Sequence, residues 1–140
     1  MGMASRGRGG STTGTRGPTR YVKAHTWAGT GLEILGEQDF TGTHLNRVGV
    51  RVVCFGAAWC PVTRRFIPKL VEARGKIGGT LAIADITELD SPLWDTFRIR
   101  ITPSIIVFRD GEAHTRVDGR RFIGITRSAL AKLGPSIGTP

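Results

Sequence analysis

A nearly continuous apolar segment, Val48–Phe55, is followed after four residues by Cys60 and Pro61. An apolar run of this length is typical of a strand buried on both faces, which requires other elements packed on either side of its sheet. Pro61 suits the first position of a helix, where its missing N–H is not needed, and Phe66 and Leu70 continue that helix with an apolar face. This strand–turn–helix unit predicts an α/β fold.

The same alternation of strand and helix patterns continues on both sides of this unit, and Arg109–Glu112 is a hairpin signal between the expected strands Ile105–Phe108 and Ala113–Val117. The order predicts a mixed central β-sheet with helices on both faces. The expected strands are Leu32–Leu35, Val48–Phe55, Leu81–Ile86, Ile105–Phe108 and Ala113–Val117, and the expected helices are Glu37–Asn46 (anchored by Phe40 and Leu45), Pro61–Arg74, Pro92–Phe97 and a last one capped by Thr126.

Positive charge is concentrated at the N-terminus, because the segment from Met1 to Leu32 has basic residues and no acid. Residues 1–28 are rich in Gly, Arg, Ser and Thr and lack a periodic apolar face, which predicts a disordered basic tail. We expect a folded domain over residues 29–134 and a flexible C-terminus over 135–140. The Arg-Gly spacing of the tail is also found in segments that bind RNA through charge, although a solubilising leader is the favoured interpretation.

Several classes of protein are excluded by what the sequence lacks. It has no run of 18 apolar residues, so no membrane span is expected, and its start lacks the apolar core of a secretory signal. Its two cysteines, Cys54 and Cys60, do not form the disulfide framework of a secreted mini-domain. We therefore expect a cytoplasmic protein with no bound cofactor and no metal.

Cys60 is the candidate reactive residue. Its position just before Pro61 directs the first N–H groups of the helix towards the sulfur, and the positive end of the helix dipole favours the thiolate. Arg64 and Arg65, one turn further on, add to this effect. A thiolate is the nucleophile of disulfide exchange. The alternative is a buried structural cysteine, the commonest state of a free cysteine.

These pieces together resemble the thioredoxin family. Leu32–Leu35 is similar to the first strand of the family, and Val52–Cys60 to the strand and turn that lead to its attacking cysteine. Ile99–Ser104 resembles the segment with the cis-proline opposite that cysteine, Phe108–Glu112 the following hairpin, and Gly119 the glycine of the loop beside the substrate groove. The resemblance covers residues 30–134 and implies a thioredoxin-like fold.

Two departures from the family pattern bear on activity. The family motif is Trp-Cys-x-x-Cys, whereas this chain has Thr63 in the place of the second, resolving cysteine. Members commonly carry a buried acid six residues before the attacking cysteine, and this chain has Cys54 there. Without a resolving thiol, Cys60 can still attack a disulfide, but it cannot complete an intramolecular dithiol reduction. Cys54 is a possible secondary thiol, although direct pairing with Cys60 requires distortion of a buried strand.

The resemblance implies a thiol–disulfide oxidoreductase with Cys60 as nucleophile and Thr63 as a hydrogen-bond donor to its thiolate. An external thiol such as glutathione, acting as co-substrate, completes the cycle, and the partners are protein or glutathione disulfides. The alternative is a redox-inactive binding module that uses the same groove. The expected substrate-binding residues are Trp59, Pro61, Thr102, Pro103 and Gly119, and the resemblance also places a basic rim of Arg64, Arg65, Arg100, Arg120 and Arg121 near the site, which favours an anionic partner.

Overall fold

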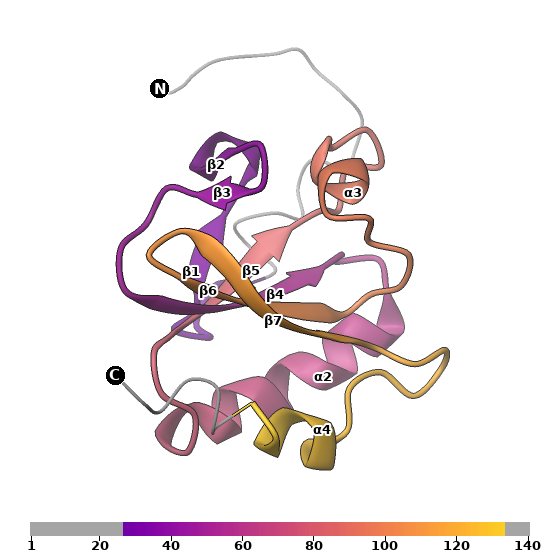
Figure 1. Ribbon diagram of the computed structural model, residues 1–140. Coiled ribbons are helices and arrows are strands. Elements are labelled where there is room, and N and C mark those ends of the chain that lie inside the picture. Colours follow the sequence, from indigo (N-terminus) through magenta and orange to yellow (C-terminus); the bar gives the residue numbers. More distant parts are fainter. Residues whose placement is uncertain (1–26, 134–140) are drawn as a thin grey trace.

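The computed structural model describes residues 27–133 and contains a five-stranded sheet (Figure 1). The sheet order is β1-β5-β4-β6-β7. Strand β5 lies parallel to both β1 and β4, whereas β6 runs antiparallel to β4 and to β7. The predicted mixed sheet is therefore confirmed. The strand bounds are Glu33–Leu35 (β1), Val50–Gly56 (β4), Thr80–Asp85 (β5), Ser104–Arg109 (β6) and Glu112–Asp118 (β7).

Both faces of the sheet are covered, as the continuous apolar run in β4 requires. Helices α2 (Pro61–Glu72) and α4 (Arg127–Ala131) lie on one face, and α3 (Leu93–Thr96) lies on the other (Figure 1). A short 3-10 turn, η3 (Ala73–Gly75), prolongs α2. Thr126 caps α4 as predicted, since its side chain accepts a hydrogen bond from the backbone N–H of Ala129.

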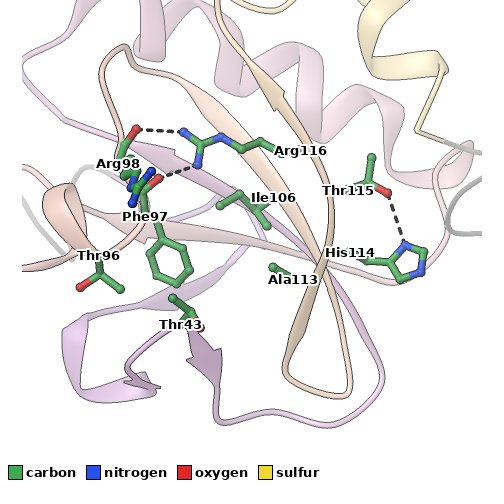
Figure 2. Close-up of a pocket in the computed structure, with 9 residues that line it drawn as sticks. All are labelled: Thr43, Thr96, Phe97, Arg98, Ile106, Ala113, His114, Thr115 and Arg116. Atoms are coloured by element: carbon green, nitrogen blue, oxygen red, sulfur yellow. Dashed lines mark hydrogen bonds between the residues drawn. The ribbon is translucent and has the colours of Figure 1, made fainter.

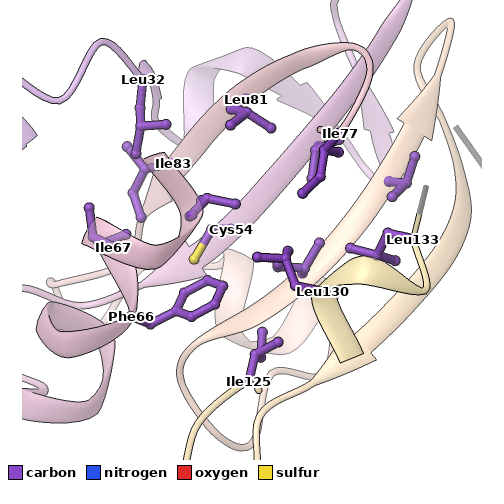
Figure 3. Close-up of a cluster of buried hydrophobic side chains, with 14 of the residues drawn as sticks. Leu32, Cys54, Phe66, Ile67, Ile77, Leu81, Ile83, Ile125, Leu130 and Leu133 are labelled. Carbon is purple, nitrogen blue, oxygen red and sulfur yellow. The ribbon is translucent and has the colours of Figure 1, made fainter. Parts of the chain in front are cut away.

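Alternate residues of β4 enter two separate cores, because successive side chains of a strand point to opposite faces. Cys54 joins the core beneath α2 and α4, where Phe66 and Leu130 lie close by (Figure 3). Phe55 joins the other core, in which the rings of Phe55 and Phe97 are 5.1 Å apart. The two cores together fix the end of β4, from which the turn to Cys60 leaves the sheet.

The predicted helix over residues 37–46 is wrong. The chain forms a single 3-10 turn, η2 (Glu37–Asp39), and then a small hairpin of β2 (Phe40–Thr41) and β3 (His44–Leu45). Gly42 at the turn has a φ of 59°, which a helix does not allow. Phe40 and Leu45 are nevertheless core residues, because they are paired across the hairpin and both face the aromatic core.

The folded domain begins earlier than the predicted residue 29. Trp27, which the prediction placed in the disordered tail, is only 2% exposed and packs in the core beneath α2. Its burial, together with a hydrogen bond to Asp85, outweighs the polar composition around it. The rest of the predicted basic tail and the predicted flexible segment 135–140 lie outside the described residues.

Strand β7 also supports the end of α3. Arg116 in β7 donates hydrogen bonds to the carbonyl oxygens of Phe97 and Arg98, where the helix leaves its last carbonyls without partners (Figure 2). The distance to the Arg98 oxygen is 3.1 Å. The same guanidinium group forms an ion pair with Asp118. This arginine holds α3 against the far side of the sheet from α2.

Candidate functional site

Cys60 occupies the N-cap of α2, immediately after the turn that follows β4. Its φ and ψ of −91° and 114° are extended, and its carbonyl oxygen accepts the first helical hydrogen bond, from the N–H of Arg64. Its own N–H bonds to the carbonyl of Ala57 at 3.1 Å, which closes the turn. The residue is 8% exposed. Cys60 is therefore held by backbone bonds on both sides, with a small part of its surface open to solvent.

The sulfur of Cys60 faces the segment before β6. Sγ lies 3.6 Å from the carbonyl oxygen of Thr102, and the peptide bond from Thr102 to Pro103 is cis. Burial alone raises the pKa of the Cys60 thiol. The side chains of Thr102 and Thr63 and the backbone N–H groups of Thr63 and Val62 outweigh burial by offering hydrogen bonds to the thiolate, so the pKa lies below its ordinary value.

Thr63, in the position of the resolving cysteine of the family, is fully buried. Its hydroxyl oxygen makes no hydrogen bond of ordinary geometry in the described part of the chain, but it lies close enough to the Cys60 sulfur to lower the pKa of that thiol. Its methyl group packs on Gly56, where an added Cβ would lie only 2.6 Å from Cγ2 of Thr63. A buried hydroxyl without a partner costs free energy, and in this place it is available to the ionised sulfur of Cys60.

The turn before Cys60 is held by Thr87, which the sequence analysis missed. The Thr87 hydroxyl accepts a hydrogen bond from the N–H of Ala58 at 2.9 Å, and its carbonyl accepts one from the indole of Trp59, also at 2.9 Å. Thr87 is in turn fixed by Asp85, whose Oδ1 accepts hydrogen bonds from the Thr87 hydroxyl and backbone N–H. The feature of the sequence that could have indicated this role is Asp85, an acidic residue at the end of a buried strand.

Trp59 forms one flank of the site. Its side chain is 51% exposed and stacks on Trp94, with ring centroids 6.2 Å apart and an angle of 12° between the rings. A shallow pocket of about 510 Å³ lies beside it, lined by Trp59, Thr87, Glu88, Leu89 and Asp90. Such an exposed aromatic surface beside the Cys60 turn is suited to apolar contact with a partner chain.

The other flank is the loop after β7, which packs directly on the cis-proline. The N–H of Gly119 bonds to the carbonyl of Pro103 at 3.0 Å, and a Cβ at Gly119 would lie 2.4 Å from that oxygen. A Cβ at Gly124 would lie 2.8 Å from Cγ1 of Val62 in α2.

The structure thus brings together the predicted residues Cys60, Thr63, Thr102, Pro103 and Gly119, while Pro61 is exposed and Trp59 lies at the edge of the site.

Cys54 is unsuited to act as the secondary thiol. It is fully buried among the apolar side chains beneath α2, and burial raises the pKa of its thiol far above the ordinary value (Figure 3). Both cysteines are free. A thiol that stays protonated in an apolar core is a poor nucleophile.

The predicted basic rim is partly assembled. Arg65 donates a hydrogen bond to the carbonyl of Phe122 at 2.9 Å, and the guanidinium of Arg121 lies 5.9 Å from the centroid of the Phe122 ring. Arg64 and Arg120, the chain neighbours of these two arginines, are exposed, and so is Arg100.

Residues 27–133 contain neither a cluster of metal ligands nor a membrane-spanning helix. No three His, Cys, Asp or Glu side chains in this range come close enough to hold a metal ion. Within the same range, no helix has the length and apolar character needed to cross a membrane.

Cys60 thus lies at the start of a helix and faces the segment that carries the cis peptide bond before β6. The family model described as Thioredoxin matches residues 32–131, and the chain therefore belongs to the thioredoxin family. This confirms the resemblance and the thioredoxin-like fold inferred from the sequence.

Individual relatives agree with this assignment. The thioredoxin of Staphylococcus haemolyticus is 37% identical over 75 residues, which are 51% of this chain and 69% of that protein. The thioredoxin of Staphylococcus epidermidis is 36% identical over the same shares of the two chains.

Solved structures show the same fold at lower identity. Thioredoxin f2 of Chlamydomonas reinhardtii aligns with a TM-score of 0.61 at 17% identity, covering 79% of this chain and 100% of that one. Oxidised mitochondrial thioredoxin 3 of Saccharomyces cerevisiae aligns with a TM-score of 0.55 at 21% identity, covering 76% and 96%.

Proposed function

We propose that the protein is a thiol–disulfide oxidoreductase that acts through the single attacking cysteine Cys60. Family membership implies thiol–disulfide chemistry, and the single-thiol mechanism is our addition. The observation that carries it is the environment of the Cys60 sulfur, in which hydrogen-bond donors lower the pKa while Thr63 occupies the place of a second thiol. Thiolate formation is thus supported, but an intramolecular disulfide with residue 63 is impossible.

The reaction on a glutathionylated protein has two exchange steps. The Cys60 thiolate attacks the glutathione sulfur, the bond to the protein sulfur breaks, and the protein leaves as a thiolate that takes a proton from water. A glutathione thiolate then attacks the Cys60–glutathione disulfide, which restores the Cys60 thiolate and releases oxidised glutathione. The protein sulfur is reduced to a thiol and one glutathione thiol is oxidised, since the other half of the oxidised glutathione comes from the original mixed disulfide; no bound cofactor is needed.

In this mechanism the neighbours of Cys60 have separate tasks. Thr63 donates a hydrogen bond to the thiolate, and the backbone of Thr102 and Pro103 receives the substrate chain. Trp59, Pro61 and Gly119 line the surface on which that chain lies. A reducing compartment such as the cytoplasm, where glutathione is abundant, suits this cycle.

One comparison supports the external thiol. A yeast structure with the same fold, aligned with a TM-score of 0.53 at 20% identity, is described in connection with the thiol resolving mechanism of a mitochondrial one-cysteine peroxiredoxin via glutathione and thioredoxin systems. That description concerns the yeast protein, and it supports our choice of glutathione for this chain.

The test is turnover of a glutathionylated peptide by glutathione, followed by coupled reduction of oxidised glutathione. We expect Cys60→Ser to abolish turnover. Cys54→Ser, at the fully buried second cysteine, should leave turnover unchanged, provided that circular dichroism shows the variant to be folded. Wild-type turnover by the Cys60→Ser variant would refute the mechanism.

The second candidate is a redox-inactive binding module, favoured by the low exposure of Cys60 (8%) beside the half-exposed Trp59. It predicts that alkylation of Cys60 follows the pH dependence of a free thiol, and that Cys60→Ser binds partners as the wild type does. A midpoint for alkylation below that of a free thiol would rule against it.

A further inference from the structure

The loop over residues 119–124 presents an exposed aromatic side chain in a strained conformation. Phe122 has a φ of 64° and is 78% exposed, and Ile123 beside it is 52% exposed. A bulky residue at positive φ is disfavoured, because its Cβ approaches the following carbonyl oxygen. Neither burial nor backbone preference therefore explains phenylalanine at this position, whereas contact with a partner does.

This loop is a fixed part of the rim of the Cys60 site. Backbone hydrogen bonds of 3.0 and 2.7 Å join Arg120 and Gly124 in both directions and close the loop at its base. The base itself rests on Pro103 through Gly119 and on Val62 through Gly124. Phe122 is thus held beside the segment that faces the sulfur.

The loop also carries positive charge that is not neutralised. Arg65 and Arg121 meet at Phe122, and Arg120 is exposed next to them. Within residues 27–133 none of the three forms an ion pair with a carboxylate. Four other arginines do form such pairs, namely Arg47, Arg51, Arg116 and Arg127.

The opposite flank of the site, beside Trp59, carries acidic side chains instead of basic ones. The pocket beside Trp59 is lined by Glu88 and Asp90, with Leu89 77% exposed between them. A partner that lies across Cys60 therefore meets an acidic, apolar surface on one side and a basic, apolar surface on the other. The arginines on the side of the 119–124 loop attract carboxylates of the partner.

We propose that the 119–124 loop, with Arg65, forms a specificity surface for acidic protein disulfides. Its substrates have an apolar side chain next to the attacked cysteine, which contacts Phe122 and Ile123, and carboxylates further out, which pair with Arg65, Arg120 and Arg121. Because the surface combines two exposed apolar side chains with three arginines, we assign it to a protein segment. The inference rests on the proposed function of Cys60.

The test compares two synthetic pentapeptides, Asp-Leu-Cys-Leu-Asp and Lys-Leu-Cys-Leu-Lys, each with its cysteine in a disulfide with thionitrobenzoate. Cys60 attacks the peptide sulfur and releases coloured thionitrobenzoate, whose appearance gives the second-order rate constant. At low salt we expect the acidic peptide to react about 10-fold faster or more, a preference that salt reduces. Equal rates for the two peptides would overturn the proposal.

Charge-reversal variants test whether Arg120 and Arg121 cause the faster reaction of the acidic peptide. Arg120→Glu with Arg121→Glu should reduce the ratio of the two rate constants to one or below. The matched control, Lys76→Glu with Lys132→Glu, makes the same change in net charge near the far end of α2, roughly 18 Å along a helix of 12 residues. The control should keep the wild-type ratio, and an equal shift in both double variants would contradict the assignment.

Phe122→Gly tests the apolar part without risk to the fold, because glycine adopts positive φ freely. It should slow the reaction with Asp-Leu-Cys-Leu-Asp more than the reaction with Asp-Gly-Cys-Gly-Asp. Equal slowing of both would show that Phe122 does not recognise the neighbouring side chain.

Binding separates this proposal from the proposed function. Peptides with serine for cysteine and a fluorescent label report affinity by anisotropy without any exchange reaction. Tighter binding of the acidic peptide supports the surface even if Cys60 proves unreactive, and equal affinities overturn it even if Cys60 reacts. A preference for single-stranded RNA over the acidic peptide, lost in Arg120→Glu with Arg121→Glu, would assign the surface to nucleic acid and refute our proposal.

Discussion

The indole nitrogen of Trp27 lies 3.1 Å from Oδ2 of Asp85, 58 residues further along the chain. The same carboxylate holds Thr87, which supports the turn before Cys60 through Ala58 and Trp59. The first described residue of the domain is therefore linked by hydrogen bonds to the turn that precedes Cys60.

Substitution of Asp85 should disturb both stability and reactivity. In Asp85→Asn, one oxygen still accepts from Thr87, but the amide nitrogen faces the indole N–H of Trp27, so two donors oppose each other. We expect a loss of about 1–3 kcal/mol in the free energy of unfolding, measured with urea, and slower alkylation of Cys60. Asp90→Asn, at an exposed position, is the control and should change neither quantity.

Thr63→Val should separate stability from reactivity. Valine keeps the shape of threonine but removes a buried hydroxyl that has no partner, so the fold should gain about 1 kcal/mol. The same change removes a donor to the Cys60 thiolate, which raises the pKa of Cys60 and slows alkylation at neutral pH. Thr63→Ser retains the donor and should react as the wild type does. A Thr63→Val protein that is both less stable and equally reactive would contradict this account.

The two cysteines should make opposite contributions to the pH dependence of stability. The pKa of Cys60 is lower in the folded than in the unfolded state, so its contribution is present above the unfolded value, about 8.5, and is lost as pH falls through the folded value. The pKa of Cys54 is raised, so its contribution is present below that unfolded value and is lost at higher pH.

Urea midpoints measured across the pH range test this linkage. Cys60→Ser should remove the rise in stability that the wild type shows as pH increases towards about 8.5, and Cys54→Ala should reduce the loss at more alkaline pH. Identical pH profiles for wild type and Cys60→Ser would mean that the thiolate is not stabilised by the fold.

Arg116→Met should destabilise the protein, because it leaves the carbonyl groups of Phe97 and Arg98 without their donor (Figure 2). We expect a loss of roughly 1–3 kcal/mol by urea unfolding. Arg127→Met removes an exposed ion pair with Glu72 and should cost at most about 1 kcal/mol. Equal effects of the two substitutions would argue against a capping role for Arg116.

Local patterns predicted most of this fold. The apolar run of β4, Pro61 at the start of α2 and the Thr126 cap each act within a few residues of their own position, and the structure has all three. The hairpin over residues 40–45 was mistaken for a helix because Phe40 and Leu45 bury apolar side chains in either structure. Their pairing across β2 and β3 is what the sequence pattern does not specify.

The parts of the site that were missed depend on contacts between distant segments. Trp27 is buried through a partner far along the chain, and Thr87 is placed by the pairing of β5 with β4. The conformation of Phe122 depends on how its loop meets Pro103 and Arg65. By contrast, Cys60 was found from residues on either side of it, because a helix N-terminus is a local feature.

The close packing of Gly56 against Thr63 means that these two positions cannot vary independently. A methyl group at residue 56 collides with the γ-methyl of Thr63, so alanine fits there only when residue 63 is a smaller or unbranched side chain. A variant with cysteine at position 63 is therefore free to carry alanine at position 56, whereas alanine at position 56 of the present sequence requires residue 63 to change as well.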